Sequence, residues 1–284
     1  NVVLSNTGDS ALTLSGVTLP AAPFSAVAPV IASGTVIPAN SSVTQVLRFA
    51  PTASGPFSGS LSVTANTGQP AISVALSGTG ATASGCASTL PAVTTSSWQR
   101  NGSASLSGSA VQLTPVATGA AGSVIYTTPL SSANLRICFD ADIGGGSGAD
   151  GMALMLLNPT AGPGALGAAG SGLGYGGLSG VAVTLDTYDS GAGDPSDNFV
   201  GIATGGSTAA LTYLATSTAI PTLEGAGPVP VEVEVVAGRL VVRVAGSQVL
   251  DTAVSLPGQV LLGFGAGTGG LDNRHLVGNV RVAN

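Results

Sequence analysis

Short runs in which apolar side chains alternate with hydroxyl-bearing ones recur along the whole 284-residue chain. Leu61, Val63 and Ala65, for example, alternate with Ser62 and Thr64. Because neighbouring side chains of a β-strand point to opposite faces, such a run buries one face and leaves hydroxyls on the other. No segment keeps a 3.6-residue period, and 43 Gly and 17 Pro supply frequent turns. The pattern predicts an all-β protein of short antiparallel strands.

The composition argues against nucleic-acid binding and against a membrane span. Charged residues make up only 7% of the chain, the net charge is −6, and all seven basic residues are Arg. A nucleic-acid partner is therefore not expected, because it needs a basic stripe. No run of about 18 apolar residues occurs, so no membrane span is expected in this chain. The hydroxyl-rich, Lys-free composition fits a secreted or cell-surface bacterial protein.

Residues 1–80 predict a small sandwich. They carry two charges, Asp9 and Arg48, and about six alternating runs separated by turns. VVLSNTGDSALTLSGVTL, IPANSSVTQVLRFAPTASGPFSG and ISVALSGTG resemble the Hydin-type (choice-of-anchor D) immunoglobulin-like domain of bacterial surface proteins. Members of that family usually have a strand before the first of these segments. We therefore expect either a chain cut from a longer protein or a strand from another copy, paired beside Val2–Ser5 or near Ile72–Ser77.

A second unit is expected from residue 86 to residue 284, after a flexible linker at residues 81–85. Its alternating runs predict a large antiparallel sandwich. Cys86 and Cys138 lie 52 positions apart, a spacing that fits neither a metal site nor a CxxC redox pair. A disulfide is predicted for an exported protein, and the alternative is two buried thiols. Since Cys138 alternates with Ile137 and Phe139, we expect it on the opposite sheet face.

Acidic residues gather in one part of the second unit. Seven Asp and no basic residue lie between Asp140 and Asp197. An alternating strand ends at Asp186, and a glycine-containing loop returns Asp194 towards it. Ca²⁺ binds six to eight hard oxygens, which such a loop provides through carboxylates and backbone carbonyls. The spacing indicates either a calcium site or a solvated acidic loop.

Four segments of this unit resemble the legume-type (L-type) lectins. VAVTLDTYDSGAGDPSDNFVGI resembles the metal loop of that family, and GADGMALMLLNP its Asp-Gly-aliphatic segment. GSGLGYGGLSG resembles the glycine-rich sugar loop, and VLLGFGAGTGGLDNRHLVGNVRV the last strands with the variable loop between them. They occur in lectin order and cover most of residues 86–284. The resemblance implies a concanavalin-like jelly roll.

The resemblance also implies a single calcium site. Asp186 and Asp194 match the two carboxylate ligands, and Tyr188 matches the residue whose backbone carbonyl binds the ion. The usual Asn ligand falls at Asp189 or Ser190, because this loop is about one residue shorter than in common plant members.

No transition metal is expected. Plant members bind one through a Glu and a His, and Thr184 and Phe199 stand at those positions here. Without the imidazole, a nitrogen-containing site cannot form. The single histidine, His275, is expected to be a loop or strand-end residue.

The sugar site follows from the same resemblance. Asp150 matches the carboxylate that accepts hydrogen bonds from sugar hydroxyls, and Gly174 or Gly176 would present a backbone N–H. The variable loop that tunes specificity contains Gly269, Gly270 and Leu271, and Asp189 borders the site. The candidates for an aromatic ring against the sugar are Tyr175, Tyr188 and Phe199.

These features predict a carbohydrate-binding adhesin held on an immunoglobulin-like spacer, not an enzyme. A glycoside hydrolase would need two carboxylates about 5–9.5 Å apart, and Glu232 and Glu234 on one strand face are the only sequence candidates. The alternative is a structural subunit of an extracellular fibre or surface layer, since a nearly uncharged chain is not kept apart by repulsion. That subunit would form homo-oligomers through strand complementation.

Overall fold

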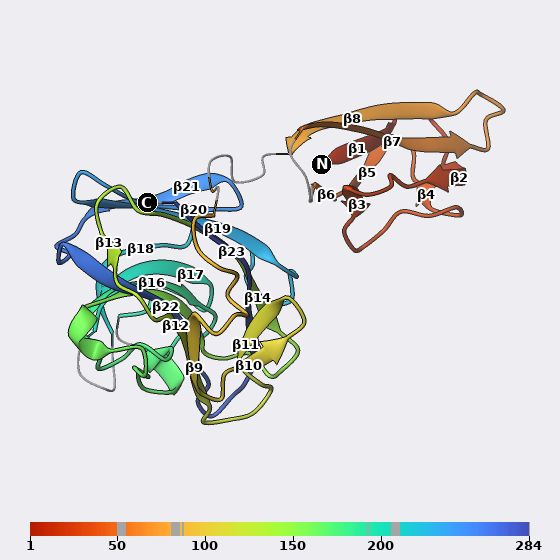
Figure 1. The fold of residues 1–284 in the computed structure, drawn as a ribbon. Helices are drawn as coiled ribbons and strands as arrows, with labels where there is room; N and C mark the ends of the chain where they lie inside the picture. The colour runs from red at the N-terminus through yellow and green to blue at the C-terminus, as the bar shows by residue number, and fades with distance from the viewer. Residues whose placement is uncertain (50–54, 81–85, 87, 192, 206–210, 284) are drawn as a thin grey trace. The chain divides into compact units, whose positions relative to one another are not determined.

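The structure is a computed structural model that describes residues 1–49, 55–80, 86, 88–191, 193–205 and 211–283. The chain forms two compact units, Asn1–Ser84 (unit 1) and Gly85–Asn284 (unit 2). Within the described residues the regular elements are β-strands and two single 3-10 turns, which confirms the all-β prediction (Figure 1). The linker predicted at residues 81–85 lies outside the described residues. No described helix is long and apolar enough to cross a membrane.

Unit 1 is a small β-sandwich with a four-stranded sheet in the order β4-β2-β7-β8. Two further strand pairs, β1-β5 and β3-β6, complete it. Among the described strands, β1 pairs only with β5 and β8 only with β7. The strands are β1 (Val2–Asn6), β2 (Leu12–Thr18), β3 (Phe24–Ala26), β4 (Val36–Ile37), β5 (Ser41–Gln45), β6 (Leu47–Phe49), β7 (Gly55–Ala65) and β8 (Ile72–Gly80).

Beside its aliphatic core of Leu14, Ile31, Ile37 and Val63, unit 1 contains a group of phenyl rings. Phe24 lies 4.8 Å from Phe49 between ring centroids, and Phe57 lies 6.1 Å from Phe49. A Cβ at Gly78 would come within 2.7 Å of the Phe49 ring, and one at Gly59 within 3.0 Å of Phe24. The two glycines therefore leave the space that the rings occupy, which the sequence pattern alone does not reveal.

Unit 2 consists of two antiparallel sheets and two 3-10 turns. The seven-stranded sheet has the order β10 (Ser105–Ser107), β11 (Ala110–Thr114), β23 (Arg274–Ala283), β14 (Arg136–Gly144), β19 (Val229–Val236), β20 (Arg239–Val244) and β21 (Ser247–Ala253). The eight-stranded sheet has the order β18 (Thr212–Ser217), β17 (Phe199–Thr204), β16 (Gly180–Asp186), β15 (Gly151–Leu157), β22 (Gln259–Gly267), β12 (Ala121–Tyr126) and β9 (Trp98–Gly102), with β13 (Leu130–Ser131) beside β22. The 3-10 turns are η1 (Pro159–Ala161) and η2 (Gly170–Gly172).

The central strands of the eight-stranded sheet, such as β15 and β16, are covered on both faces. Alternate residues such as Leu154 pack with Phe139 and Val231 in the core between the two sheets. The opposite face, which includes Met155, is covered by Tyr175 and neighbouring residues of the segment 158–180. Double coverage explains why β15 reads MALMLL without alternation, since a strand buried on both faces has no polar side.

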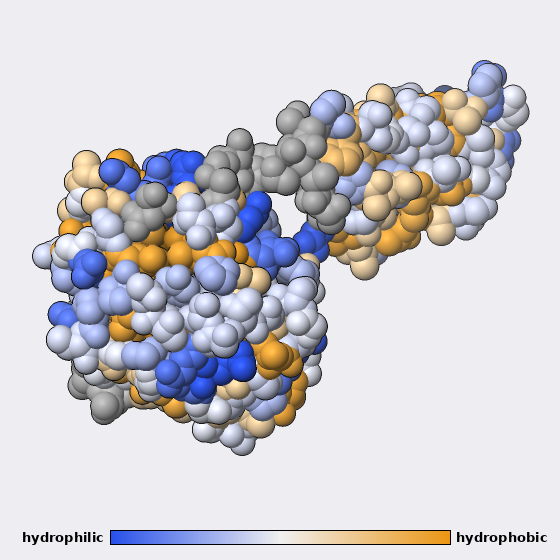
Figure 2. Space-filling model, in the orientation of Figure 1, coloured by the Kyte–Doolittle hydropathy of each residue, from blue (hydrophilic) through white to orange (hydrophobic). Residues whose placement is uncertain are grey.

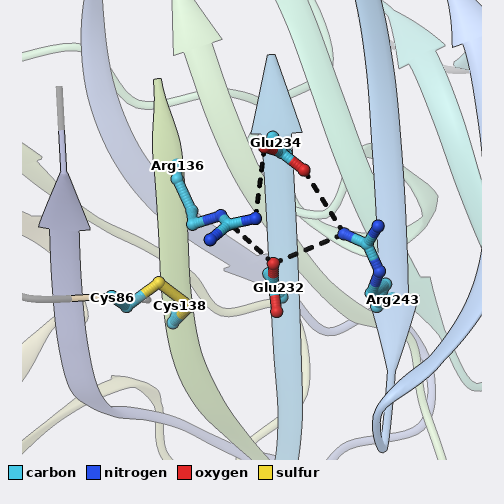
Figure 3. A network of polar contacts seen from close by, with 6 residues as sticks. All are labelled: Cys86, Arg136, Cys138, Glu232, Glu234 and Arg243. Atoms are coloured by element: carbon cyan, nitrogen blue, oxygen red, sulfur yellow. Dashed lines mark hydrogen bonds and ion pairs between the residues drawn. A yellow bond between two sulfur atoms is a disulfide. The ribbon is translucent and has the colours of Figure 1, made fainter. Parts of the chain in front are cut away.

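The outer face of the seven-stranded sheet carries a compact group of charges. Arg136 and Arg243 each pair with both Glu232 and Glu234, at 3.2 to 3.4 Å (Figure 3). The most hydrophilic residues of the visible surface form a few patches, and residues of intermediate or high hydropathy cover much of the rest (Figure 2). Both glutamates are thus held by guanidinium groups, and the geometry gives no support to the hydrolase alternative.

The predicted disulfide is present. Cys86 and Cys138 are joined, with their Cα atoms 6.1 Å apart. Cys138 pairs in register with Glu232 and so lies on the outer sheet face, opposite Ile137 and Phe139, which are in the core. The bond fastens the start of unit 2 to the middle of β14 (Figure 3).

Removing this bond should destabilise unit 2. The disulfide links residues 52 positions apart, so replacing both cysteines with serine increases the conformational entropy of the unfolded chain. This should lower the free energy of unfolding by about 4 kcal/mol. Urea denaturation of the double variant against the wild type measures this difference. Equal midpoints under oxidising conditions would contradict the prediction.

Candidate functional site

Three neighbouring strands bring the candidate site together. Gly151 at the start of β15 pairs with Asp186 at the end of β16 and with Gly267 at the end of β22. Asp150 therefore lies directly before one strand, and the loops of the other two leave from the same rung. Its backbone is held on both sides: its N–H donates to Gly267 O at 3.2 Å, and its C=O accepts from Thr187 N at 2.8 Å.

Asp186 is a buried carboxylate with two hydrogen-bond donors. The Tyr188 N–H donates to Oδ1 at 3.0 Å, and the Tyr213 hydroxyl donates to Oδ2 at 3.3 Å. The residue is 2% exposed. Its pKa is raised to about 8, mainly by burial and also by the charges of Asp194 and Asp150, against the lowering effect of the two donors. The charged groups near Asp186 are thus carboxylates. A cation at this place would offset both the cost of burying the ionised Asp186 and its repulsion by the neighbouring carboxylates.

The loop after Asp186 is folded on itself by its own acids. The Ser190 N–H donates to Asp194 Oδ2 and the Gly191 N–H to Asp189 Oδ1, each at 2.9 Å. Burial raises the pKa of Asp194 as well. Among the described residues no three His, Cys, Asp or Glu side chains are grouped closely enough to hold a metal by themselves. A cation in this loop would need main-chain oxygens in addition to Asp186 and Asp194.

Asp150 has a buried oxygen without a hydrogen-bond partner. The residue is 5% exposed, and its Oδ2 has no partner in the structure. Burial raises its pKa to about 6, against the lowering effect of the Gly269 backbone. A Cβ at Gly269 would lie 3.1 Å from Asp150 Oδ2. Gly269 therefore allows the loop of residues 268–272 to approach the acid, and the 39% exposed Leu271 lies in the same loop.

The glycine-rich loop does not present the expected donor. The Gly174 N–H donates to Ala168 O at 2.9 Å, and the Gly176 N–H donates to Gly172 O at 2.7 Å. Both N–H groups are hydrogen-bonded within the segment, because the backbone groups of a tight loop pair with one another. The N–H groups beside Asp150 belong instead to the loop that contains Gly269.

Only one of the three predicted rings is exposed. Tyr175 and Phe199 are fully buried, whereas Tyr188 is 39% exposed. The Tyr175 hydroxyl donates to Gly180 O at 2.6 Å and accepts from Gly205 N at 2.7 Å, so this ring anchors the loop. Tyr175 and Phe199 are therefore not available to a sugar.

Two residues that shape the site were not predicted from the sequence. Thr268 ties the loop of residues 268–272 to its neighbour, since its Oγ1 accepts from Ala120 N at 2.8 Å and donates to Ala117 O at 2.6 Å. Tyr213 reaches Asp186 from β18, 27 positions away. The position of Thr268 between two glycines could have indicated its role, but no feature of the neighbouring sequence indicates the role of Tyr213.

His275 is the second residue of β23, as expected for a strand-end position. It is fully buried, with Nδ1 2.6 Å from Thr114 Oγ1. Burial lowers its pKa to about 3, so the ring is neutral at pH 7. Its role is in the packing of β11 against β23.

Calcium-free protein should become less stable as pH rises. The folded-state pKa of Asp186 is about 8 against an ordinary 3.8, so the folded protein keeps a proton that the unfolded chain releases. The free energy of unfolding contributed by this group therefore falls from about pH 4 to pH 8. Thermal melts in chelator should show a flatter pH dependence for Asp186→Asn, while the exposed Asp9→Asn follows the wild type. Parallel curves for Asp186→Asn and wild type would refute the assignment.

No protein-family model and no curated protein matches the sequence. Solved structures do resemble the chain. The VIP36 exoplasmic/lumenal domain in its Ca²⁺/Man-bound form has a TM-score of 0.55 and 21% identity, covering 66% of this chain and 82% of that one. Metal-free lectin I-B4 from Griffonia simplicifolia has a TM-score of 0.54 and 22% identity, covering 66% and 92%. The Emp47p carbohydrate recognition domain has a TM-score of 0.53 and 14% identity, covering 67% and 89%. The chain therefore contains the antiparallel β-sandwich fold of these L-type lectin domains.

Proposed function

We propose that unit 2 is a calcium-supported carbohydrate-binding module. The observation that carries the proposal is the unpartnered, buried Oδ2 of Asp150 beside a loop of uncompensated carboxylates. A buried acceptor without a donor is unusual, and a sugar hydroxyl is a donor of suitable size and chemistry. The likeness to structures described as Ca²⁺- and mannose-bound supports the same reading. Binding without catalysis is proposed, since Glu232 and Glu234 are paired with arginines.

The residues present fit calcium. Asp186 and Asp194 would supply carboxylate oxygens, Tyr188 its backbone carbonyl, and Asp189 or Ser190 a further oxygen. All these ligands are hard oxygens, which Ca²⁺ prefers. In many calcium sites water molecules complete the coordination number of six to eight. Bound calcium would neutralise the carboxylates and hold the loop in one conformation.

The same loops would form the sugar site. Asp150 would accept a hydrogen bond from a sugar hydroxyl, and the backbone N–H of Gly270 or Leu271 would donate one to a neighbouring sugar oxygen. The Gly269 N–H is already directed at Asp150, so it orients the acid. The partly exposed ring of Tyr188 and the side chain of Leu271 offer apolar surface at the edge, with Asp189 beside them.

Unit 1 is proposed as an immunoglobulin-like spacer that holds the binding module of a secreted or cell-surface protein. The disulfide in unit 2 supports this placement, because such bonds persist in oxidising compartments. The low content of charged residues, 7% of the chain, is consistent with it.

A glycan array with and without chelator tests the binding function. Asp150→Asn removes an acceptor and should lower glycan affinity at least tenfold, which corresponds to about 1.4 kcal/mol. Because this residue is not among the proposed calcium ligands, calcium should still raise the melting temperature. Asp186→Ala should abolish both responses, and Asp251→Asn on the seven-stranded sheet should abolish neither.

Calcium binding to the folded state alone stabilises it by about 2.7 kcal/mol at a hundredfold excess over Kd. Glycan binding that is unaffected by Asp150→Asn would contradict the sugar site. A melting temperature that does not respond to calcium would contradict the metal site.

A further inference from the structure

We infer that Tyr213 is the positioning residue for Asp186, holding its carboxylate in the orientation that receives the cation. The inference rests on the proposed function. Asp186 Oδ1 is held by the N–H of Tyr188, two positions along the same loop. Oδ2 is held from outside the loop, by the Tyr213 hydroxyl at 3.3 Å. The orientation of the carboxylate thus depends on one local donor and one distant donor.

A register shift in the sheet determines where Tyr213 lies. Ile202 of β17 pairs with Ala215 of β18, but the next residue, Ala203, pairs with Tyr213. Leu214 is therefore the extra residue of a β-bulge and is 46% exposed. Without the bulge, Leu214 would face Ala203 and Tyr213 would point to the other face of the sheet.

The face that Tyr213 acquires is the one that carries Asp186. Asp186 pairs with Phe199, and Thr184 pairs with Gly201, so these residues share the face of Ala203. The Tyr213 ring lies 5.3 Å from the Phe199 ring in an edge-to-face arrangement. The Thr184 Oγ1 lines the same space, 2.8 Å from where a Cβ at Gly201 would lie. These contacts set the position of the hydroxyl.

Gly201 provides the space for the ring. A Cβ at this position would come within 2.5 Å of Tyr213 Cε1 and 2.6 Å of Cδ1. The backbone of β17 and the ring would both have to move, because the ring is also packed against Phe199. Any residue other than glycine would therefore displace the hydroxyl from Asp186.

The chemistry of a carboxylate explains the effect. Each oxygen has two lone pairs, so an oxygen that accepts one hydrogen bond can still bind a cation. Partners behind a metal ligand restrict its rotation, and removing one typically lowers metal affinity 10- to 100-fold. The hydrogen bond of the Tyr213 hydroxyl goes to the proposed ligand Asp186, so its effect should act through calcium.

Titration calorimetry of the full chain with calcium chloride tests the inference. Tyr213→Phe keeps the ring and removes the hydroxyl, and it should raise the calcium Kd at least tenfold. Tyr126→Phe, a half-buried tyrosine against Trp98, is the matched control and should leave the Kd unchanged. At calcium concentrations far above the new Kd, glycan affinity should return to the wild-type value, which a merely misfolded variant would not show.

A calcium-free crystal structure of Tyr213→Phe gives a readout that does not need the ion. Its Asp186 side chain should rotate away from the wild-type position. If the wild type does not bind calcium, the proposed function fails, and this rotation alone decides the inference. An unchanged Kd with an unrotated Asp186 overturns the inference, as does a loss of glycan binding that saturating calcium does not restore. Should Tyr213→Phe not fold, Gly201→Ala must reproduce the weaker calcium binding, and wild-type affinity in that variant overturns it.

Discussion

The pairing of β15 with β16 on one side and with β22 on the other positions the groups of the candidate site. Gly151, Asp186 and Gly267 occupy one rung, so three loops leave the sheet at the same place. The strands themselves are buried on both faces, which makes the rung a rigid support. Side chains carried by such a support keep their geometry without a ligand, as a binding site requires.

Two groups of acids in unit 2 have opposite electrostatic environments. Glu232 and Glu234 lie on an outer sheet face between Arg136 and Arg243 and are neutralised within the protein (Figure 3). Asp186 and its acidic neighbours have hydrogen-bond donors but carboxylates as their nearby charges. The first group needs nothing further, and the second is stabilised by an external cation. A count of acidic residues would not distinguish them, whereas their partners do.

Glycine has a specific steric role at several points of this chain. Gly269 allows a loop to approach Asp150, and Gly201 allows a tyrosine ring to cross a strand. In both cases the missing Cβ brings a hydrogen-bond donor to a carboxylate. The high glycine content therefore serves the site as well as the turns that the sequence pattern first suggests.

Features that depend on neighbouring residues along the chain could be predicted from the amino-acid sequence. The period-two alternation predicted the all-β class, the core faces of β14 and β19, and the outward position of Cys138. The run ending at Asp186 predicted a strand end, and the structure places it there. The disulfide was predicted from the type of protein and the spacing of two cysteines.

Which N–H groups and aromatic rings can contact a ligand depends on the tertiary structure. It showed that the N–H groups of Gly174 and Gly176 are consumed within their loop and that Tyr175 and Phe199 are buried. It also placed Tyr213 beside Asp186 through a one-residue register shift. Periodicity is a local property, so it assigns a side chain to a face. Cross-strand register and hydrogen-bond partners join residues that are distant in sequence, and they exist only when the sheet is complete.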